Sequence, residues 1–492
     1  MELFLDTRKM EDYATYLKIK RLPRYRFQGH VAIFPDEYAH MLGITTDEPD
    51  ESGYVPEDFL FDYQGGVCKI AIRKRKFAGF IACGVGKSNC ILSIARYVAA
   101  QRRKGKVLIV CPLMVCPQTI SEAQRFWGKY PIEQIAARDL QKWLTASGGA
   151  IGITNYEAIR EGLRPGKLAG LILDESSLLK NASGTTAMRL IDIGKELDWK
   201  FCFTGTPAPN DRIEYASHSV FLDRFPTVNS FLAKYFVNRG ETHERWVMKP
   251  HAIRPFYRQL SDWCIFLENP ATYGWKDNTD NIPPIVVHQH PVPLTAEQRS
   301  AVSSVTKCLL GIPGGIASRS KLSQLAKGRH GGKDMHSNKI DYIRDIIAAW
   351  SATESTIVWC RFNNEQDRIA AALPGCGSIS GATKDADRQR IIADFQAGRI
   401  RTLVSKPDVL GFGLNLQVAT RHVFNGLWDS SEEYHQCVKR SNRIGSTKPL
   451  NVHIPVTDIE YAMVSNTLRK LRRMEEDTRE QERLFREVGY VG

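Results

Sequence analysis

A Gly-Lys-Ser triplet is the first group in this sequence with an evident chemistry. Gly84, Gly86, Lys87 and Ser88 lie between an apolar run and a segment of helical periodicity. Glycines let backbone N–H groups approach phosphate oxygens, and a helix start adds a positive dipole end. Lys87 is thus predicted to contact the β- and γ-phosphates, and Ser88 to bind Mg²⁺. Because Ile81 stands where the strict motif has its first glycine, a fortuitous glycine turn is the alternative.

Two acidic residues follow a second apolar run. Asp174 and Glu175 come directly after Leu171–Leu173. Such a pair predicts Mg²⁺ binding by Asp174 and orientation of an attacking water by Glu175. A strand-end Asp that caps the next helix is the alternative interpretation. Ligands of open α/β sheets bind at the carboxyl ends of strands, and both groups follow strands, so together they favour a nucleotide site.

Two further segments suit a part in nucleotide hydrolysis. Thr204 and Thr206 follow the apolar run Phe201–Phe203 and predict coupling of the site to a moving surface, with a simple turn as the alternative. Arg440 and Arg443 are three residues apart and would share one face if their segment is helical. Arginines in a cleft neutralise a departing γ-phosphate, whereas a solvated basic helix face is the commoner fate of such pairs.

The elements that position these residues form two similar sets. In each set, short apolar runs without polar alternation are separated by segments of helical periodicity, which predicts parallel sheets covered on both faces. The predicted strands of the first set are 77–83, 107–111, 151–154, 171–173 and 201–203. Those of the second set are 356–360, 378–380, 402–405, 422–425 and 452–455. The fold class is therefore α/β, with two lobes.

Composition marks the remaining boundaries. The segment 45–58 is acidic and rich in turn residues, periodicity fades over 223–293, and 311–339 is basic and glycine-rich. A solvated surface is favoured over a DNA contact for the last stretch. The predicted division is an N-terminal accessory unit 1–55, an ATP-binding lobe 56–222, a mostly helical insertion 223–310, a basic linker 311–338, a second lobe 339–457 and a C-terminal helix 458–492.

Length, charge and cysteine usage exclude several classes of protein. The 492 residues are 43% hydrophobic and 25% charged, which excludes wholesale disorder. A net charge of +13 favours polyanionic partners, nucleic acid before an anionic membrane. The longest apolar stretch, 107–117, is shorter than the roughly 18 residues of a spanning helix, and the N-terminus has no signal-peptide pattern. Eleven cysteines without a C-x-x-C argue against disulfides or zinc, and the expected location is cytoplasmic.

Taken in chain order, these segments resemble the motifs of superfamily-two helicases of the Swi/Snf-like branch, in particular phage or prophage versions. The resemblance spans about 59 to 455 and rests on FDYQGGV, CGVGKS, VLIVCPLMV, ITNYEAI, DESS, TGTP, WCRFNNEQ, GFGLNLQ and QCVKRSNRIG. It implies two RecA-like parallel-sheet lobes in tandem. The sequence departs from the pattern at Ala82, Ser176, Ser177, Leu410 and Ser446, and the serines after Glu175 could alter how hydrolysis is coupled to movement.

The resemblance also implies a function and further site residues. ATP with Mg²⁺ would lie between the lobes, and the chain would be an ATP-dependent DNA translocase or helicase. Duplex or branched DNA is favoured and RNA is left open; protein partners would bind the accessory unit or the insertion. By motif position, Gln64 reads the adenine, and Gly413 and Gln436 belong to the nucleotide site. The nucleic-acid path is expected at Pro112, Asn155, Tyr156 and Gln417, and Trp428 is expected in the core rather than as a stacking residue.

Two other functions remain open from the sequence. A nucleic-acid-binding scaffold or switch could retain an ATP site without productive movement, although the intact Lys87, Glu175 and arginine pair argues against a decayed ATPase. The motor part of a restriction or defence assembly would need a partner for cleavage, since the chain shows no metal-nuclease signature.

Overall fold

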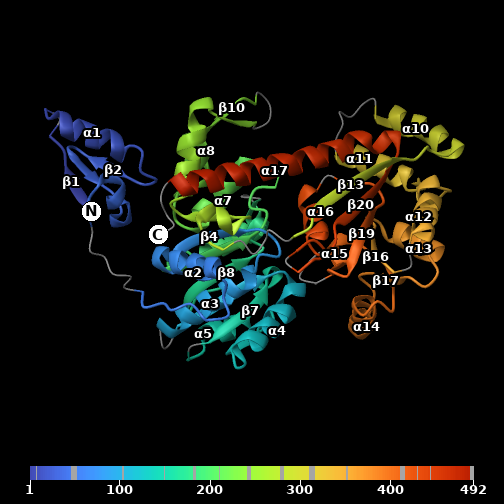
Figure 1. Cartoon of the computed structure of the whole chain (residues 1–492), viewed down its shortest axis with the longest axis horizontal. Helices are drawn as coiled ribbons and strands as arrows, with labels where there is room; N and C mark the ends of the chain where they lie inside the picture. Colours follow the sequence, from blue (N-terminus) through green and yellow to red (C-terminus); the bar gives the residue numbers. More distant parts are fainter. Residues whose placement is uncertain are drawn as a thin grey trace. The chain divides into compact units, whose positions relative to one another are not determined.

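The computed structural model describes residues 1–6, 8–45, 52–101, 105–148, 150–180, 184–209, 211–240, 245–276, 282–309, 316–350, 353–410, 416–428, 430–443 and 445–487. The described chain divides into two compact units (Figure 1). The first unit comprises Met1–Ala82, Gly86–Asp277 and Glu475–Gly492, and the second comprises Cys83–Val85 and Asn278–Met474. Each has its own parallel sheet, as the two sets of apolar runs predict.

A small accessory unit precedes the first sheet. Its three strands form an antiparallel sheet in the order β1-β3-β2, which α1 accompanies. The elements are β1 Glu2–Phe4, α1 Met10–Ile19, β2 Arg26–Gln28, β3 Val31–Ile33 and the 3-10 helix η1 Asp36–Leu42. The Tyr38 hydroxyl donates a buried hydrogen bond to Asp262 Oδ1 over 2.5 Å, and Lys74 forms ion pairs with Glu37 and Asp262. Buried charged contacts thus join the accessory unit to the rest of the first unit.

The first unit contains a seven-stranded sheet in the order β12-β4-β9-β8-β5-β7-β6, and its neighbouring strands pair in parallel. Its central strands are buried along their whole length, because their side chains are apolar on both faces. The strands are β4 Lys76–Ile81, β5 Lys106–Cys111, β6 Ile132–Gln134, β7 Ile151–Asn155, β8 Leu168–Asp174, β9 Trp199–Thr204 and β12 Cys264–Leu267.

Helices cover this sheet, and α3 shows why they form where they do. Ile91, Ile94, Ala95 and Val98 are buried on one face of α3, at the spacing of a helical stripe. The helices are α2 Asp62–Lys74, α3 Lys87–Gln101, α4 Cys116–Trp127, α5 Leu140–Thr145, α6 Thr185–Ile193, α7 Tyr215–Phe221, α8 Val228–Tyr235 and α9 Ile253–Leu260. A two-stranded antiparallel ribbon pairs β10 Phe236–Asn238 with β11 Trp246–Met248.

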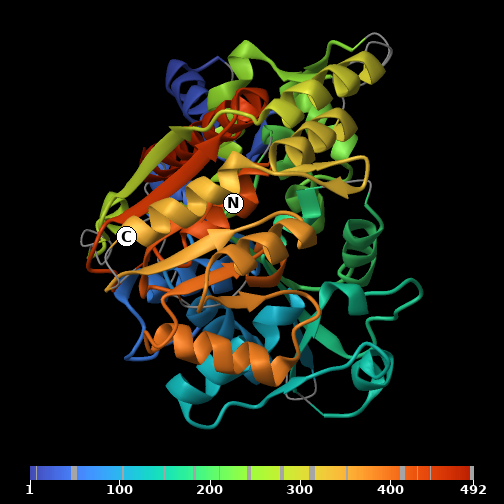
Figure 2. The same cartoon turned by 90° about the vertical axis from the view of Figure 1, so that its right-hand side faces the viewer.

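The second unit contains a six-stranded parallel sheet in the order β13-β20-β19-β16-β18-β17. In Figure 2 its strands face the viewer, with yellow to orange helices in front of them. The strands are β13 Ile285–Pro291, β16 Ser355–Trp359, β17 Gly377–Ile379, β18 Thr402–Ser405, β19 Ala419–Phe424 and β20 Leu450–Val456. The helices are α10 Ala296–Leu309, α11 Ile316–Ala326, α12 Asn338–Ala349, α13 Asn363–Ala372, α14 Asp385–Gln396, α15 Pro407–Leu410 and α16 Ser431–Val438.

The long C-terminal helix predicted for 458–492 is present as α17 Tyr461–Glu487, after the 3-10 turn Asp458–Glu460. Its first part contributes Val464 and Leu471 to the core of the second unit. Its second part belongs to the first unit, where Asp477 pairs with Arg212 and Glu482 accepts the backbone N–H of Glu268 over 2.7 Å. One helix therefore has buried contacts within both units.

The separate helical insertion predicted for 223–310 is wrong as a domain. Strand β12 pairs with β4 in the first sheet, and β13 pairs with β20 in the second, so both sheets recruit strands from this range. Sequence periodicity missed them because β12 has only four residues and β13 is an edge strand with half-exposed polar positions.

The basic linker predicted for 311–338 also differs from the structure. The described part holds helix α11 and the hairpin of β14 Arg329–His330 with β15 Lys333–Asp334. Lys327 within this stretch and Lys339 directly after it are buried, and both pair with Glu460. Part of its positive charge is therefore internal.

Candidate nucleotide site

The predicted catalytic residues of the first unit meet at the carboxyl edge of its sheet. Strands β4, β9 and β8 are neighbours, and the motif segments follow each of them directly. Lys87 begins α3 after β4, Thr204 ends β9, and Asp174 ends β8. The edge of an open parallel sheet is where α/β proteins bind ligands, so the topology brings together what the sequence holds about 90 residues apart.

The glycines of the loop between β4 and α3 have the conformation that a phosphate cradle needs. Gly84 and Gly86 have φ angles of +89° and +81°, where side chains are strained. A Cβ on Gly86 would also lie 2.0 Å from Gln64 Nε2. The Gln64 side chain is buried; it accepts the Phe61 N–H over 3.1 Å and donates to the Gly86 carbonyl over 3.5 Å. Gln64 thus lies against the phosphate-binding loop.

Lys87 forms a mixed cluster with the acidic pair. Its ammonium nitrogen lies 2.9 Å from Glu175 Oε1 and 3.7 Å from Asp174 Oδ1, and all three side chains are largely buried. Burial raises the pKa of Asp174 to about 6; Lys87 opposes this shift and Glu175 adds to it. With one cation and two carboxylates, the cluster has one more acidic group than basic groups. Such an excess of negative charge is suited to binding a divalent cation.

The backbone at Glu175 is in the left-handed region, with φ +54°. That conformation is costly for a residue with a side chain and occurs most often at functional sites. The Glu175 N–H donates to the Asp174 carboxylate over 3.0 Å, and Thr204 Oγ1 donates to Glu175 Oε2 over 3.4 Å. The Thr206 N–H in turn donates to Thr204 Oγ1 over 3.1 Å. Both threonines are buried, and Thr204 links its segment to the acidic pair.

Tyr156 does not fit the nucleic-acid path expected from its motif position. Its side chain is 4% exposed, and its hydroxyl donates to the Asp174 carbonyl over 2.7 Å. It supports the end of β8 from within the core instead. Asn155 ends β7 and accepts the Ala158 N–H over 3.1 Å, while Pro112 precedes a turn in which Leu113 and Met114 are exposed. Pro112 and Asn155 therefore lie at the same sheet edge as the acidic pair.

A histidine that the sequence did not single out contacts the acidic motif. Ser176 Oγ lies 3.1 Å from His218 Nε2, and both side chains are fully buried. Burial lowers the pKa of His218 to about 4, so the ring is neutral at pH 7. Helix α7 is thereby tied to the segment that carries Glu175. Nothing in the sequence around His218 marks it as a site residue, since it lies in a short helix about 40 residues after the acidic motif. The serines after Glu175, which depart from the family pattern, were the one signal near this contact.

The arginines expected to act on the γ-phosphate lie in the second unit, but not on a helix. Helix α16 ends at Val438, and Arg440 and Arg443 lie in the following turn, so the shared helical face is wrong. Serine side chains hold this turn by bonding its main chain: Ser446 Oγ accepts the Arg443 N–H over 3.2 Å and donates to the Ser441 carbonyl over 2.7 Å. Such local side-chain bonds compete with helix continuation.

The other expected residues of the second unit have mixed outcomes. Gln436 is buried in α16, and Gln417 lies half-buried just before β19. Gly413 lies outside the described residues. Trp428 is 8% exposed and packs in the core of the unit, as expected.

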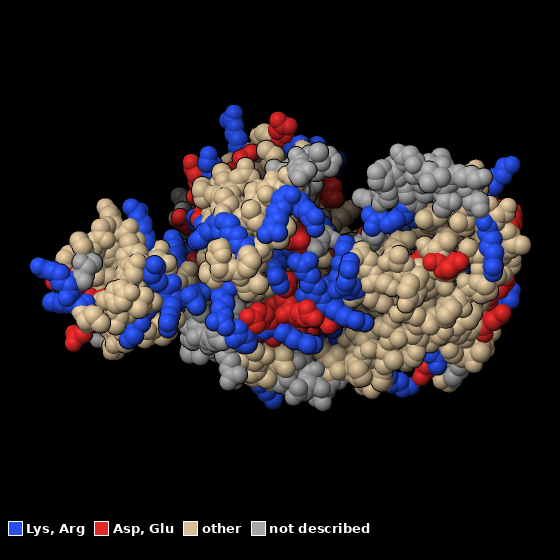
Figure 3. Space-filling model, turned by 90° about the horizontal axis from the view of Figure 1, so that it is seen from above, with Lys and Arg blue, Asp and Glu red and all other residues tan. Residues whose placement is uncertain are grey.

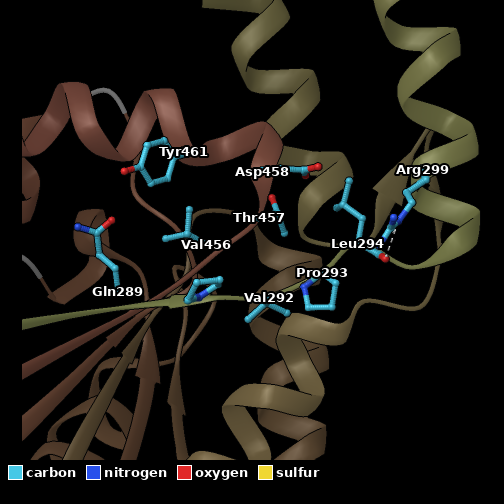
Figure 4. A pocket seen from close by; sticks show the side chains of 10 residues that line it. Gln289, Val292, Pro293, Leu294, Arg299, Val456, Thr457, Asp458 and Tyr461 are labelled. Atoms are coloured by element: carbon cyan, nitrogen blue, oxygen red, sulfur yellow. Dashed lines mark hydrogen bonds between the residues drawn. The ribbon is translucent and has the colours of Figure 1, made fainter.

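A pocket of about 620 Å³ in the second unit lies beside the start of α17 (Figure 4). Pro291, Val292, Leu294 and Val456 line it, and Arg299 is turned to the Leu294 carbonyl over 3.3 Å. This mainly apolar lining offers no cradle for phosphates. The nucleotide chemistry therefore belongs to the sheet edge of the first unit.

The donor set at that edge fits Mg²⁺ shared with a nucleotide. Ser88 in the first turn of α3 and Asp174 supply a hydroxyl and a carboxylate. Mg²⁺ usually takes one or two protein oxygens and completes its shell with phosphates and water. In the described ranges no three His, Cys, Asp or Glu side chains gather as an all-protein metal site, which agrees with such sharing.

A glycine loop, a lysine and an acidic pair at the edge of a parallel sheet form a candidate nucleotide site, and comparison with known proteins gives the family of the chain. The SNF2-related domain matches residues 73–338, more than half of the chain, and the Helicase conserved C-terminal domain matches 338–445. The chain therefore belongs to the SNF2-related family. The Swi/Snf-like resemblance of its motifs is confirmed.

Two similar proteins illustrate the range of this likeness. Protein p41 of Acyrthosiphon pisum secondary endosymbiont phage 1 is 23% identical over 311 residues, which are 58% of this chain and 65% of that protein. The chain thus spans less than two thirds of the length of this relative. The Sulfolobus solfataricus SWI2/SNF2 ATPase core in complex with dsDNA is 17% identical, with a TM-score of 0.41, over 88% of this chain and 96% of that one. None of the helices in the described ranges is long and apolar enough to span a membrane.

Proposed function

We propose that this chain is an ATP-driven translocase that moves along duplex or branched DNA. The observation that carries the proposal is the Lys87–Asp174–Glu175 cluster at the sheet edge, together with a second unit that supplies Arg440 and Arg443. A net charge of +13 suits a polyanionic track. Movement along DNA must be independent of sequence, so the grip would use phosphate contacts rather than base edges.

Each residue of the cluster has a distinct role in this proposal. Lys87 leaves the carboxylates to neutralise the β- and γ-phosphates, and Glu175 then orients the attacking water as general base. Mg²⁺, held by Ser88 and Asp174, would neutralise charge on the phosphates. Arg440 and Arg443 would act on the γ-phosphate from the second unit, so that its loss releases the two units from each other.

The proposed DNA path runs over Pro112, Asn155 and Gln417. Support comes from exposed Leu113 and Met114 beside Pro112, which leave this turn open to a ligand. Tyr156 is not part of the proposed path, because its hydroxyl donates a hydrogen bond to the Asp174 carbonyl within the core. RNA as a track is tested together with DNA below.

The test compares ATP hydrolysis with single-stranded, duplex, forked and four-way DNA and with RNA. We expect duplex-containing DNA to stimulate hydrolysis most, and a triplex-displacement assay to show movement along the duplex. Lys87→Ala should abolish both while DNA binding is largely kept.

The alternative scaffold or switch makes the opposite prediction. It expects nucleotide-dependent DNA binding without displacement of the triplex strand. Stimulated hydrolysis without displacement would therefore overturn translocation, and unchanged hydrolysis by Lys87→Ala would overturn the assigned site. Arg443→Ala should lower turnover far more than ATP affinity; an effect on affinity alone would remove its role in the reaction.

A further inference from the structure

The accessory unit carries a row of aromatic rings that the ATPase chemistry leaves unexplained. Tyr13 and Tyr16 of α1 are stacked at 6.2 Å between ring centroids, Tyr16 lies 5.0 Å from Phe27 of β2, and Phe27 lies 5.5 Å from Tyr25. We call these four rings the aromatic row. Tyr13 is 53% exposed and Tyr25 38%, whereas aromatic side chains of this size usually contribute to a core.

The surroundings of the row are positively charged. Between residues 13 and 35 the sequence has five cations and no Asp or Glu. All five are exposed, and they are Lys18, Lys20, Arg21, Arg24 and Arg26. Lys20 Nζ lies 5.0 Å over the ring of Tyr16. The acids nearest in sequence, Glu11 and Asp12, lie in the first turn of α1, and Asp12 accepts the Asp6 N–H over 2.8 Å. Figure 3 shows blue Lys and Arg side chains over the accessory unit, at the left.

The row continues into a polar pocket of about 360 Å³ within the first unit. Arg24 and Tyr25 line it from the accessory unit, and Arg224, Lys234 and Gln259 from the other side. Its acids have cationic partners: Asp262 pairs with Lys74 and Arg224, and Asp223 pairs with Lys76 and Lys200. With those carboxylates paired, Arg24 and Lys234 remain to attract an anion.

We infer that the aromatic row binds unpaired nucleotides of a nucleic-acid strand, distinct from the duplex track of the ATPase core. The exposed rings of Tyr13 and Tyr25, supported by the packed rings of Tyr16 and Phe27, offer faces on which bases stack, and the flanking cations hold the backbone phosphates. Charge selects this occupant over a protein partner, because the surface has five cations without a carboxylate among them. A paired duplex hides its base faces, so the row selects single-stranded tails or gaps.

The experiment measures anisotropy of labelled DNA with the full chain and no ATP. The probes are a 15-nucleotide single strand, a blunt duplex, and the duplex with a 15-nucleotide tail. The variant Tyr13→Ala/Tyr25→Ala removes two exposed rings and spares the packed pair Tyr16 and Phe27. We expect it to bind the single strand and the tail at least about 10-fold more weakly, since each stacked base contributes on the order of tenfold. Blunt-duplex affinity should change less than twofold.

Phe4→Ala is the matched control, because Phe4 is 66% exposed on the same unit and its ring lies 6.0 Å from that of His30, outside the aromatic row. It should bind all probes like the parent. Equal losses on all three probes would reduce the row to a general phosphate contact, and an unchanged tyrosine variant would assign the surface to a protein partner; either result overturns the inference. Because no ATP is present, failure of translocation would leave this measurement intact.

Discussion

Two buried ionic clusters in this molecule have the same size and opposite composition. In the first unit one lysine, Lys87, faces two carboxylates, Asp174 and Glu175. In the second unit one carboxylate, Glu460, faces two lysines, Lys327 at 2.9 Å and Lys339 at 2.6 Å. The first cluster opens on the sheet edge with side chains 6–12% exposed, whereas the second is 0–3% exposed.

The difference separates a binding site from a structural support. Burial disfavours the charge of Glu460, but Lys327 and Lys339 outweigh it and lower the pKa of Glu460. Burial and the nearby Lys327 lower the pKa of Lys339 to about 8. Gly426 allows this close packing, because a Cβ there would lie 2.5 Å from Glu460 Oε1. In the first unit burial, with a smaller contribution from Glu175, instead raises the pKa of Asp174 despite Lys87, and a bound cation would favour the charged carboxylate.

Glu175→Gln should have the largest effect on ATP turnover. It tests whether the Lys87 cluster serves catalysis, whereas the Glu460 cluster serves stability. Loss of a general base lowers turnover by about 10²–10⁴-fold. Stability should not fall, since Lys87 and Asp174 remain as a pair. Stimulated ATP hydrolysis and urea unfolding measure the two quantities. Glu157→Gln, an exposed carboxylate on the turn after β7, is the control and should be neutral in both. A large loss of stability in Glu175→Gln would make its cluster a structural one.

Glu460→Gln should do the reverse. Two buried ammonium groups would lose their partner, which costs about 3–5 kcal/mol of the free energy of unfolding. Asp387→Asn is the control: Asp387 pairs with Arg390 at the surface, where such pairs contribute about 0–1 kcal/mol. Urea denaturation at pH 7 measures both. If the two substitutions lower the free energy of unfolding equally, the buried Glu460 cluster does not have the proposed structural role.

Acidification should weaken the second unit more than the first. Burial lowers the pKa of His422 and His435 to about 3 and that of His453 to about 4, whereas in the first unit His218 is the one described histidine with such a shift. On unfolding, each imidazole ring regains its ordinary pKa. Below about pH 6.5 the unfolded chain therefore binds protons that the folded chain does not bind, and stability falls with pH. For the fully buried His422, this uptake lowers the free energy of unfolding by about 2 kcal/mol between pH 7 and pH 5.

Fluorescence of single-tryptophan variants in each unit would follow this acid unfolding. His422→Gln removes one proton from the uptake and should flatten the pH dependence of the second unit. If His422→Gln leaves the pH dependence of the unfolding free energy unchanged, carboxylates alone determine the acid sensitivity of the second unit.

Thr204→Val should have the smallest effect. It removes the hydroxyl that donates to Glu175 and accepts the Thr206 N–H. One neutral hydrogen bond contributes about 1 kcal/mol, so turnover should fall several-fold. Thr204→Ser, which keeps the hydroxyl, should restore most of it. A null effect of Thr204→Val on DNA-stimulated hydrolysis would remove Thr204 from the coupling path.

The parts that sequence reasoning predicted correctly share a local cause. Apolar runs such as 107–111 and 402–405 specify buried strands through their own side chains, and α3 shows its stripe within 15 residues. Strand β13 was missed because its edge position leaves it without a continuous apolar pattern. The turn that carries the arginines was not expected, because the Ser446 side chain holds it by hydrogen bonds to Arg443 and Ser441 that residue spacing does not reveal.

The amino-acid sequence by itself determined the two α/β lobes, the phosphate-binding loop and the family, because these depend on residue types at short spacing. Only the tertiary structure decided which charges meet. It placed Lys327 and Lys339 on Glu460 rather than at the surface, buried Tyr156 behind Asp174 and joined His218 to Ser176. The physical reason is that the energy of a charge or hydroxyl depends on burial and on partners tens to more than a hundred residues away, which no local pattern specifies.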